Sequence, residues 1–510
     1  MNQPSFSRRD ALRIAGLSGL AYMLPSTATA AEGGTLRAAM GASGPSEPID
    51  PVAGLSSQTL AFVCFDRLTF VGANGRVVPE LATHWEHNAD NTQWTFHLRT
   101  DVVFHDGKPL TANDVVRTYR RMLNAKLGSQ AYRLFSIALD ADGVTAVDPH
   151  TVRFTCKAPF WDLPQAAADS HVSIVPESAP LDALVPKPVG TGPFVLQEWV
   201  PGDHLFATKN AHYWRAGYPK LDAIRVFQIS DVPQRVAGLL SNQFDLILDL
   251  NAVAIQQLKG NPKFQISSVP SGNCININVE TDKKPFDDNR VRQALKLAYD
   301  RSTLVKSVFL GEAREGSDQP ISPVADIWGH IPVPKYDTAR AKQLLAEAGY
   351  PNGIDMSLTT STIAAGAVDV AVAYQQYAAP AGIRVKVNQV PASGYYYNVD
   401  ALKWNAWIEP WNMRPEEFLF FIEYAPRGGK IPPTRWQPPQ FMQMLTAARA
   451  ATNDKDRLAK FAALERFLAE NGPSIIPVYV NVIDAHSTSV QGYQGNPIAT
   501  NREFWKLALT

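Results

Sequence analysis

The period of the apolar residues changes repeatedly along this chain, and no other feature of the sequence limits its fold as strongly. Residues 94–98 alternate apolar and polar side chains, as a half-buried strand does. Residues 291–298 and 341–348 repeat apolar side chains at helical spacing, and a longer helical stretch runs from about 439 to 470 with a break near 452–456. The two periods mix without a strict strand–helix–strand rhythm, so the pattern predicts an α/β fold.

Short polar motifs mark where several of these elements begin or turn. Asp106-Gly107 follows an apolar run and predicts a hairpin turn, because both turn positions favour residues that tolerate positive φ. Thr111 and Asp114 have the spacing of a capping box, which predicts a helix from this point. Similar signals predict three further elements: helices that begin at Asp287-Asp288 and at Asp337, and a β-branched strand over Val478–Val482.

The first 31 residues have the layout of a cleavable export signal. A basic segment, Ser7–Arg13, precedes an apolar run, Ile14–Leu24, and then the small residues Ala28–Ala31. The apolar run is too short to span a membrane, which takes about 20 residues. The adjacent arginines Arg8-Arg9 resemble a twin-arginine signal, and a general secretory signal is the alternative. We therefore expect a soluble, exported protein whose signal, residues 1–31, is removed.

Charge and cysteine content exclude several classes of protein. Lys+Arg and Asp+Glu number 48 each, which gives no support to nucleic-acid binding. The 510 residues suggest two or three domains. The three cysteines, Cys64, Cys156 and Cys274, form no CxxC pair and do not predict a zinc or thioredoxin-type site. Two alternatives stay open for them: one disulfide with one free thiol, or three buried thiols.

Seven stretches, taken in order, carry a family resemblance over almost the whole chain after the export signal. They are Leu81–Glu86, Trp94–Arg99, Phe104–Val115, Gly190–Phe194, Gln243–Leu246, Pro285–Ala294 and Tyr336–Ala341. As a set they resemble the family 5 extracellular solute-binding proteins. These are the dipeptide-, oligopeptide- and nickel-binding components of ABC importers.

The resemblance implies a two-lobed periplasmic binding protein of type II, whose lobes close about a hinge. It also implies an additional subdomain inserted in the first lobe. We expect the first lobe to comprise residues 32–62, 186–270 and 481–510, the inserted subdomain 63–185, and the second lobe 271–480.

An aromatic segment at 404–418 is the leading candidate for the ligand site, because in the family a loop of the second lobe at this place is informative. Peptide binders use an aspartate there to hold the ligand's α-ammonium. When Pro415 is aligned to the family proline, Trp411 stands at that position. The guanidinium of nearby Arg414 offers two parallel N–H donors that match a carboxylate. The candidate ligand-binding residues of the segment are Trp407, Glu409, Trp411, Asn412 and Arg414.

Other candidates flank this segment. Tyr396 lies upstream of it, Arg435 and Trp436 precede the long helical stretch, and Ser43 and Asn273 follow the first strand and open the second lobe. The alternative for the aromatic segment is a tryptophan-rich packing region with Arg414 in a salt bridge.

These features predict a non-catalytic binding protein that captures a peptide, an opine or another carboxylate-bearing amino-acid derivative. We expect a monomer that serves the permease and ATPase subunits of an ABC importer and holds no cofactor. Catalytic motifs such as GxSxG, HExxH and the P-loop are absent, and the scattered histidines predict no metal site. The alternatives are an exported hydrolase or a ligand sensor with the same fold, or a nickel-chelate binding protein.

Overall fold

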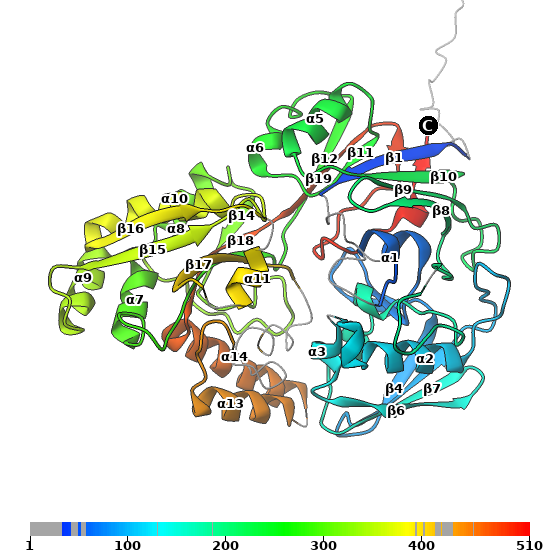
Figure 1. Cartoon of the computed structure of the whole chain (residues 1–510), viewed down its shortest axis with the longest axis horizontal. Coiled ribbons are helices and arrows are strands. Elements are labelled where there is room, and N and C mark those ends of the chain that lie inside the picture. Colours follow the sequence, from blue (N-terminus) through cyan, green and yellow to red (C-terminus); the bar gives the residue numbers. More distant parts are fainter. Residues whose placement is uncertain are drawn as a thin grey trace, which may run out of the picture.

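The structure is a computed structural model with two lobes, shown in Figure 1. It describes residues 33–41, 49–52, 58–129, 131–185, 187–392, 395–400, 403–413, 420, 432–451 and 453–510. The expected export signal therefore lies outside the described residues. Helices and sheets mix in both lobes, which confirms the predicted α/β class.

The first lobe is built on a seven-stranded sheet whose strands come from distant parts of the chain. Strand β1 pairs in parallel with β10 and β11, and the other pairs are antiparallel. In sheet order the strands are β12 (Phe264–Val269), β19 (Val482–Ser487), β11 (Leu246–Ile247), β1 (Thr35–Met40), β10 (Ala223–Gln228), β9 (His204–Lys209) and β8 (Phe194–Val200).

A six-stranded sheet forms the second lobe. Strand β13 runs antiparallel to β17 and β18, and β15 runs parallel to β16 and β17. In sheet order the strands are β14 (Ala313–Glu315), β18 (Ser474–Val480), β13 (Cys274–Val279), β17 (Ala406–Trp411), β15 (Ile354–Thr360) and β16 (Ile383–Gln389). The inner strand β13 is buried along its whole length, which fixes the position of β17 beside it.

The chain crosses between the two large sheets twice, and one crossing corrects a prediction. Strand β12 leads to β13 through residues 270–273, and Asn481 alone separates β18 from β19 (Figure 1). The single strand expected over Val478–Val482 is therefore wrong. Its residues end one strand and begin another, because the same apolar, β-branched pattern continues across the change of sheet. The two crossings touch, since Val480 N donates to Asn273 O at 2.8 Å.

A smaller, four-stranded sheet lies below the seven-stranded sheet in Figure 1, with helix α2 (Ala112–Met122) beside it. Its order is β4 (Ala82–His87), β5 (Gln93–Leu98), β7 (Thr151–Cys156) and β6 (Leu139–Asp148). Trp94, Phe96 and Leu98 of β5 are buried, as their alternation predicts. The predicted capping box is confirmed, because Thr111 N donates to Asp114 Oδ2 at 2.7 Å.

The other helix and turn predictions are also confirmed. Asp288 caps α7 (Asn289–Leu297) and Asp337 caps α9 (Thr338–Glu347), each by accepting a backbone N–H. The long helical stretch forms α13 (Pro439–Arg449) and α14 (Asp454–Asn471), with the break between them slightly earlier than the expected 452–456. Gly107 has φ 84° and its N–H donates to Phe104 O at 2.8 Å, which closes the predicted turn.

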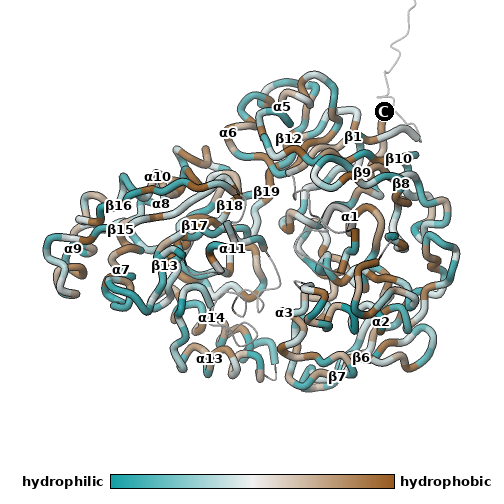
Figure 2. The backbone as a smooth tube through the Cα atoms, in the orientation of Figure 1, coloured by the Kyte–Doolittle hydropathy of each residue, from teal (hydrophilic) through white to brown (hydrophobic). Residues whose placement is uncertain are grey.

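Figure 2 shows hydrophobic and hydrophilic residues interspersed along the chain of both lobes. Among the described residues, every helix is too short or too polar to cross a membrane.

The three cysteines lie apart in the fold, and none of them is in a disulfide bond. All three belong to the described residues and all are buried. The disulfide alternative is therefore wrong, and the alternative of three buried thiols is correct. Burial raises the pKa of Cys64 well above its usual value and that of Cys156 to about 12, because a thiolate there would lose its hydration.

Candidate ligand-binding site

A cavity of about 330 Å³ lies where the two lobes meet, next to the crossings. Ligand pockets in proteins are typically about 300–1,000 Å³ and combine apolar walls with a few polar groups. The first lobe contributes Met40, Phe62, Asp249–Val253, Val482, Ile483, Ala499, Thr500, Arg502 and Phe504. The second lobe and the crossings contribute Asn273–Ile275, Val308, Phe309, Glu312, Ile363–Gly366, Asp369, Pro410–Asn412, Val480 and Asn481.

Three predicted site residues meet in this cavity. Trp411 ends β17 opposite Cys274 of β13, and Asn412 and Asn273 follow and precede those two strands. Asn273 Oδ1 accepts a hydrogen bond from Met413 N at 2.7 Å, so the side chain of Asn273 fixes the chain just beyond β17. The pairing of β13 with β17 is therefore what brings residues far apart in the sequence into one wall.

Trp407 and Glu409 share a face of β17 with Trp411 but do not line the cavity. The indole N–H of Trp407 donates to Glu409 Oε2 at 2.9 Å, and Asn278 Nδ2 donates to the same oxygen at 2.7 Å. Trp407 is only 2% exposed. These two residues thus form a buried hydrogen-bonded group earlier on β17 than Trp411, which resembles the packing alternative for this segment.

Arg435 and Trp436 also lie away from the cavity lining. Trp436 is buried against Phe441, with ring centroids 5.2 Å apart. The guanidinium of Arg435 stands 3.4 Å from Glu280 and 3.5 Å from Asp282. Both residues therefore contribute to the packing and charge balance of the second lobe rather than to the cavity wall.

Three further candidates cannot be placed as side chains. Ser43 and Arg414 lie outside the described residues. Tyr396 belongs to helix α11 (Tyr395–Asp400), but its side chain also lies outside the described part. Its neighbour Tyr395 donates its hydroxyl to Ile408 O at 2.7 Å, which ties this helix to β17.

The first-lobe wall contains polar residues that the sequence did not single out. Arg502 pairs with Asp484 at 2.7 Å and with Asp249 at 2.9 Å, and its side chain is only 6% exposed. Burial by itself lowers the pKa of Arg502, but the carboxylates of Asp484 and Asp249 reverse this effect and raise it above the usual value. For Asp249, in contrast, burial raises the pKa, and the charge of Arg502 opposes that increase. Asp249 lies four residues after Asp245. The family-like stretch Gln243–Leu246 was therefore the only sequence signal near this residue.

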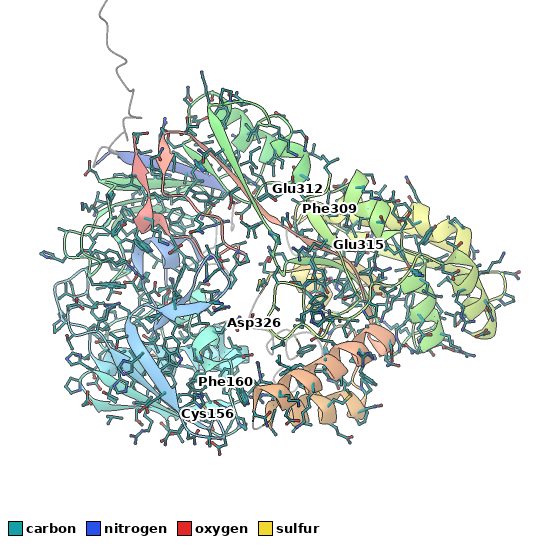
Figure 3. The ribbon with its side chains drawn as sticks, turned by 180° about the vertical axis from the view of Figure 1, so that it is seen from behind. Cys156, Phe160, Phe309, Glu312, Glu315 and Asp326 are labelled. Carbon is teal, nitrogen blue, oxygen red and sulfur yellow. The ribbon has the colours of Figure 1, made fainter. Side chains whose placement is uncertain are left out.

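Aromatic rings and acids complete the lining near the crossings. Figure 3 labels Phe309 and Glu312, which lie close together on the second lobe. Glu312 Oε2 accepts a hydrogen bond from Ser268 of the first lobe at 2.7 Å, and Lys259 lies 3.5 Å from Glu312 Oε1. Among the described lining residues, Asp249, Glu312 and Asp369 are acidic and Arg502 is basic.

Metal binding finds no support in the described part of the chain. No group of three or more His, Cys, Asp or Glu residues there could hold a metal ion. The cavity is instead suited to an organic molecule, with the aromatic faces of Phe62, Phe309, Phe504 and Trp411 beside the amide groups of several asparagines.

The lobes also meet at their far edge, away from the crossings. Arg457 of α14 pairs with Asp162 at 2.5 Å, and each side chain is 10% exposed. The indole N–H of Trp161 donates to Ala451 O at 3.1 Å, and Arg449 donates to Pro159 O at 3.2 Å. Figure 3 shows Phe160 of this segment beside α13 and α14. The two lobes are thus in contact at two separate places, beside the crossings and at this far edge.

Comparison with known proteins gives a consistent family. The family model of bacterial extracellular solute-binding proteins, family 5 middle, matches residues 76–430. Heme-binding protein A of Haemophilus influenzae is 30% identical over 480 residues, which cover 88% of this chain and 87% of that protein. The glutathione-binding protein GsiB of Salmonella typhimurium is 27% identical over 453 residues, covering 86% of this chain and 87% of that one.

Solved structures show the same fold. The binding protein AgaA of A. tumefaciens R10, in complex with agropinic acid, superposes with a TM-score of 0.81 at 24% identity. The superposition covers 94% of this chain and 99% of AgaA.

Proposed function

The chain belongs to the family 5 bacterial extracellular solute-binding proteins, and we propose that it captures a peptide or another carboxylate-bearing amino-acid derivative between its lobes for an ABC importer. The members of this family bind solutes and are not enzymes. The observation that carries the proposal is the cavity walled by both lobes, because a ligand there makes contacts that an open form lacks.

The names of the relatives support this ligand class. Glutathione, the ligand named for GsiB, is a tripeptide with free carboxylates, and agropinic acid, bound in the AgaA structure, is an organic acid. We propose that Trp411, Asn412 and Asn273, which line the cavity, contact the ligand and that Arg414 holds its carboxylate. Trp407 and Glu409 would then hold β17 against β13 through Asn278. Ser43 stays a prediction for the first-lobe wall and Tyr396 for the second-lobe side, whereas Arg435 and Trp436 stay predictions that lie outside the lining of this cavity.

We further propose that residues 1–31 direct export to the periplasm by a twin-arginine-like signal and are then removed. The mature protein would act as a monomer that delivers its solute to the permease and ATPase subunits of the importer. The division into a first lobe (32–62, 186–270 and 481–510), an inserted subdomain (63–185) and a second lobe (271–480) accords with the composition of the three sheets.

Native mass spectrometry of protein purified from its own periplasm tests the ligand class directly, because it weighs whatever is retained in the cavity. We expect one bound molecule per chain, with the mass of a small peptide or amino-acid conjugate. A thermal-shift screen with glutathione, dipeptides, agropinic acid, haem and a nickel–histidine complex supplies a second measurement. Stabilisation by haem or nickel–histidine alone would contradict the proposed class.

A further inference from the structure

Two asparagines of the cavity have side-chain amides whose orientation is fixed by the backbone. Asn251 caps helix α6 (Ala252–Ile255), and its Oδ1 accepts a hydrogen bond from Ala254 N at 2.7 Å. Asn273 Oδ1 accepts from Met413 N, also at 2.7 Å. A backbone N–H is always a donor, so these contacts settle which end of each amide is the oxygen.

The amide nitrogens are consequently available to a ligand. Neither Asn251 Nδ2 nor Asn273 Nδ2 donates to another described residue, and both side chains line the cavity. Asn481 offers a contrast in the same crossing region, because its Nδ2 already donates to Ser268 Oγ at 2.9 Å. The cavity therefore presents at least two oriented donors, one from the first lobe and one from the start of the second.

The charges around these donors decide what kind of acceptor they suit. The described lining carries the carboxylates of Asp249, Glu312 and Asp369 against the single guanidinium of Arg502. Arg502 is itself engaged by Asp249 and Asp484. Lys259 offsets Glu312 from outside the lining, but Asp249 and Asp369 still leave a net negative charge. A ligand carboxylate at this end would therefore be repelled, whereas an uncharged carbonyl or hydroxyl oxygen would not.

We infer that Asn251 and Asn273 determine specificity by donating hydrogen bonds to uncharged acceptors of the ligand, such as amide carbonyls or hydroxyls. This inference rests on the proposed function and refines it. The ligand's neutral, peptide- or sugar-like portion faces the crossings, and its carboxylate points toward another part of the site. Because the donors come from both sides of the hinge region, a ligand that uses both favours closure.

The test replaces each asparagine by aspartate. Asn251→Asp and Asn273→Asp keep the oxygen that accepts the backbone N–H, and aspartate is as good a helix cap as asparagine. Only the donor is lost, and a charged acceptor replaces it. With glutathione as the probe in calorimetry, we expect each variant to melt as the wild type does and to bind about 10-fold more weakly. Asn453→Asp, which alters the cap of α14 away from the cavity, is the matched control and should bind normally.

A second probe separates uncharged from charged acceptors. Glutathione with its glycine carboxylate amidated should lose as much affinity for both variants as unmodified glutathione does. If amidation restores binding to the aspartate variants, the acceptor is a carboxylate and the inference is overturned. Wild-type-like affinity of both variants for glutathione would overturn it as well, with the proposed function intact. Failure of the wild type to bind any of glutathione, the dipeptides and agropinic acid would instead overturn the proposed ligand class, and this inference with it.

Discussion

The two lobes meet at two places that are built in different ways. Beside the crossings, the contact consists of continuous main chain and of hydrogen bonds, from Val480 N to Asn273 O at 2.8 Å and from Ser268 to Glu312 at 2.7 Å. The buried Asp484 lies in β19, just beyond one crossing. At the far edge, the contact depends on a few side chains, chiefly Trp161, Asp162 and Arg457.

Because of this difference, we expect one set of residues to determine the stability of the fold and another to determine how readily the lobes close. The crossings persist when the lobes move apart, because the chain is continuous there. The far-edge contacts exist only when the lobes are together, so their free energy adds to that of the closed form alone. Residues at the crossings should therefore govern unfolding, whereas far-edge residues should govern ligand affinity without touching the ligand. The following substitutions test this division, in order of expected effect.

Asp484→Asn should give the largest loss of stability. Asp484 is fully buried in β19, where it accepts hydrogen bonds from Arg502 at 2.7 Å and from the Tyr493 hydroxyl at 2.6 Å. Removing one partner of a buried ion pair costs about 3–5 kcal/mol, because the other charge is left uncompensated. Because Arg502 keeps Asp249 as a second partner, denaturant unfolding should show a loss of unfolding free energy near the lower limit of this range. Asp355→Asn, in an exposed pair with Arg384, is the control and should change little.

Asp162→Asn should instead act on ligand binding. It removes the charge that pairs with Arg457 across the far edge, while no helix-capping hydrogen bond is lost. We expect an affinity loss of about 5- to 10-fold, or roughly 1–1.4 kcal/mol, and little change in unfolding. Calorimetry measures the affinity, and small-angle scattering should show a larger radius of gyration without ligand. Asp456→Asn, at an exposed pair on the same helix, should bind normally. Unchanged affinity for Asp162→Asn would contradict the assigned role of the far edge.

Trp161→Phe is a milder version of the same test. It keeps an aromatic ring but removes the N–H that donates to Ala451 O at 3.1 Å. A net hydrogen bond contributes about 0.5–1.5 kcal/mol, so affinity should fall by roughly 2- to 10-fold, toward the lower limit. Trp199→Phe is a matched control, since the buried indole nitrogen of Trp199 has no hydrogen-bond partner. Equal effects of the two substitutions would show that ring size, and not the hydrogen bond, matters.

Lys259→Met should have the smallest effect. Lys259 lies 3.5 Å from Glu312 near the crossings, and its side chain is 45% exposed. Exposed ion pairs contribute about 0–1 kcal/mol, and salt screens them. Both unfolding and affinity should stay close to wild type. A large loss of affinity would show that charge across the crossings helps to close the lobes. That result would contradict the distinction between crossing residues that govern unfolding and far-edge residues that govern affinity.

Local signals predicted the fold's elements well. The aspartate caps at Asp288 and Asp337 and the capping box at Thr111 each depend on residues within one helical turn, so the sequence contains all of their physics. The change of sheet at Asn481 has no such signal. Strands on either side share one apolar pattern, and the partners that separate them lie elsewhere in the chain.

The site was predictable only in the part that the second lobe supplies. Trp411 and Asn412 were predicted because aromatic density and a family pattern mark that segment, and Asn273 because it opens the second lobe. Asn251 and Arg502 line the same cavity from segments about 250 residues apart, and only the folded sheet brings them together. Trp407 and Glu409 have the same composition signal as Trp411, but they precede the end of β17 that lines the cavity, and only the folded sheet shows which end that is.

The three buried thiols have a consequence for how the protein meets oxidants. Burial raises the pKa of the Cys156 thiol to about 12, so the thiol stays protonated at neutral pH, and thiolate is the reactive form. Cys64 and Cys274 are buried as well. No disulfide has to form during folding or persist afterwards. The stability of the native protein should therefore not depend on the redox potential of its compartment. Its melting temperature should be the same in dithiothreitol and in oxidised glutathione.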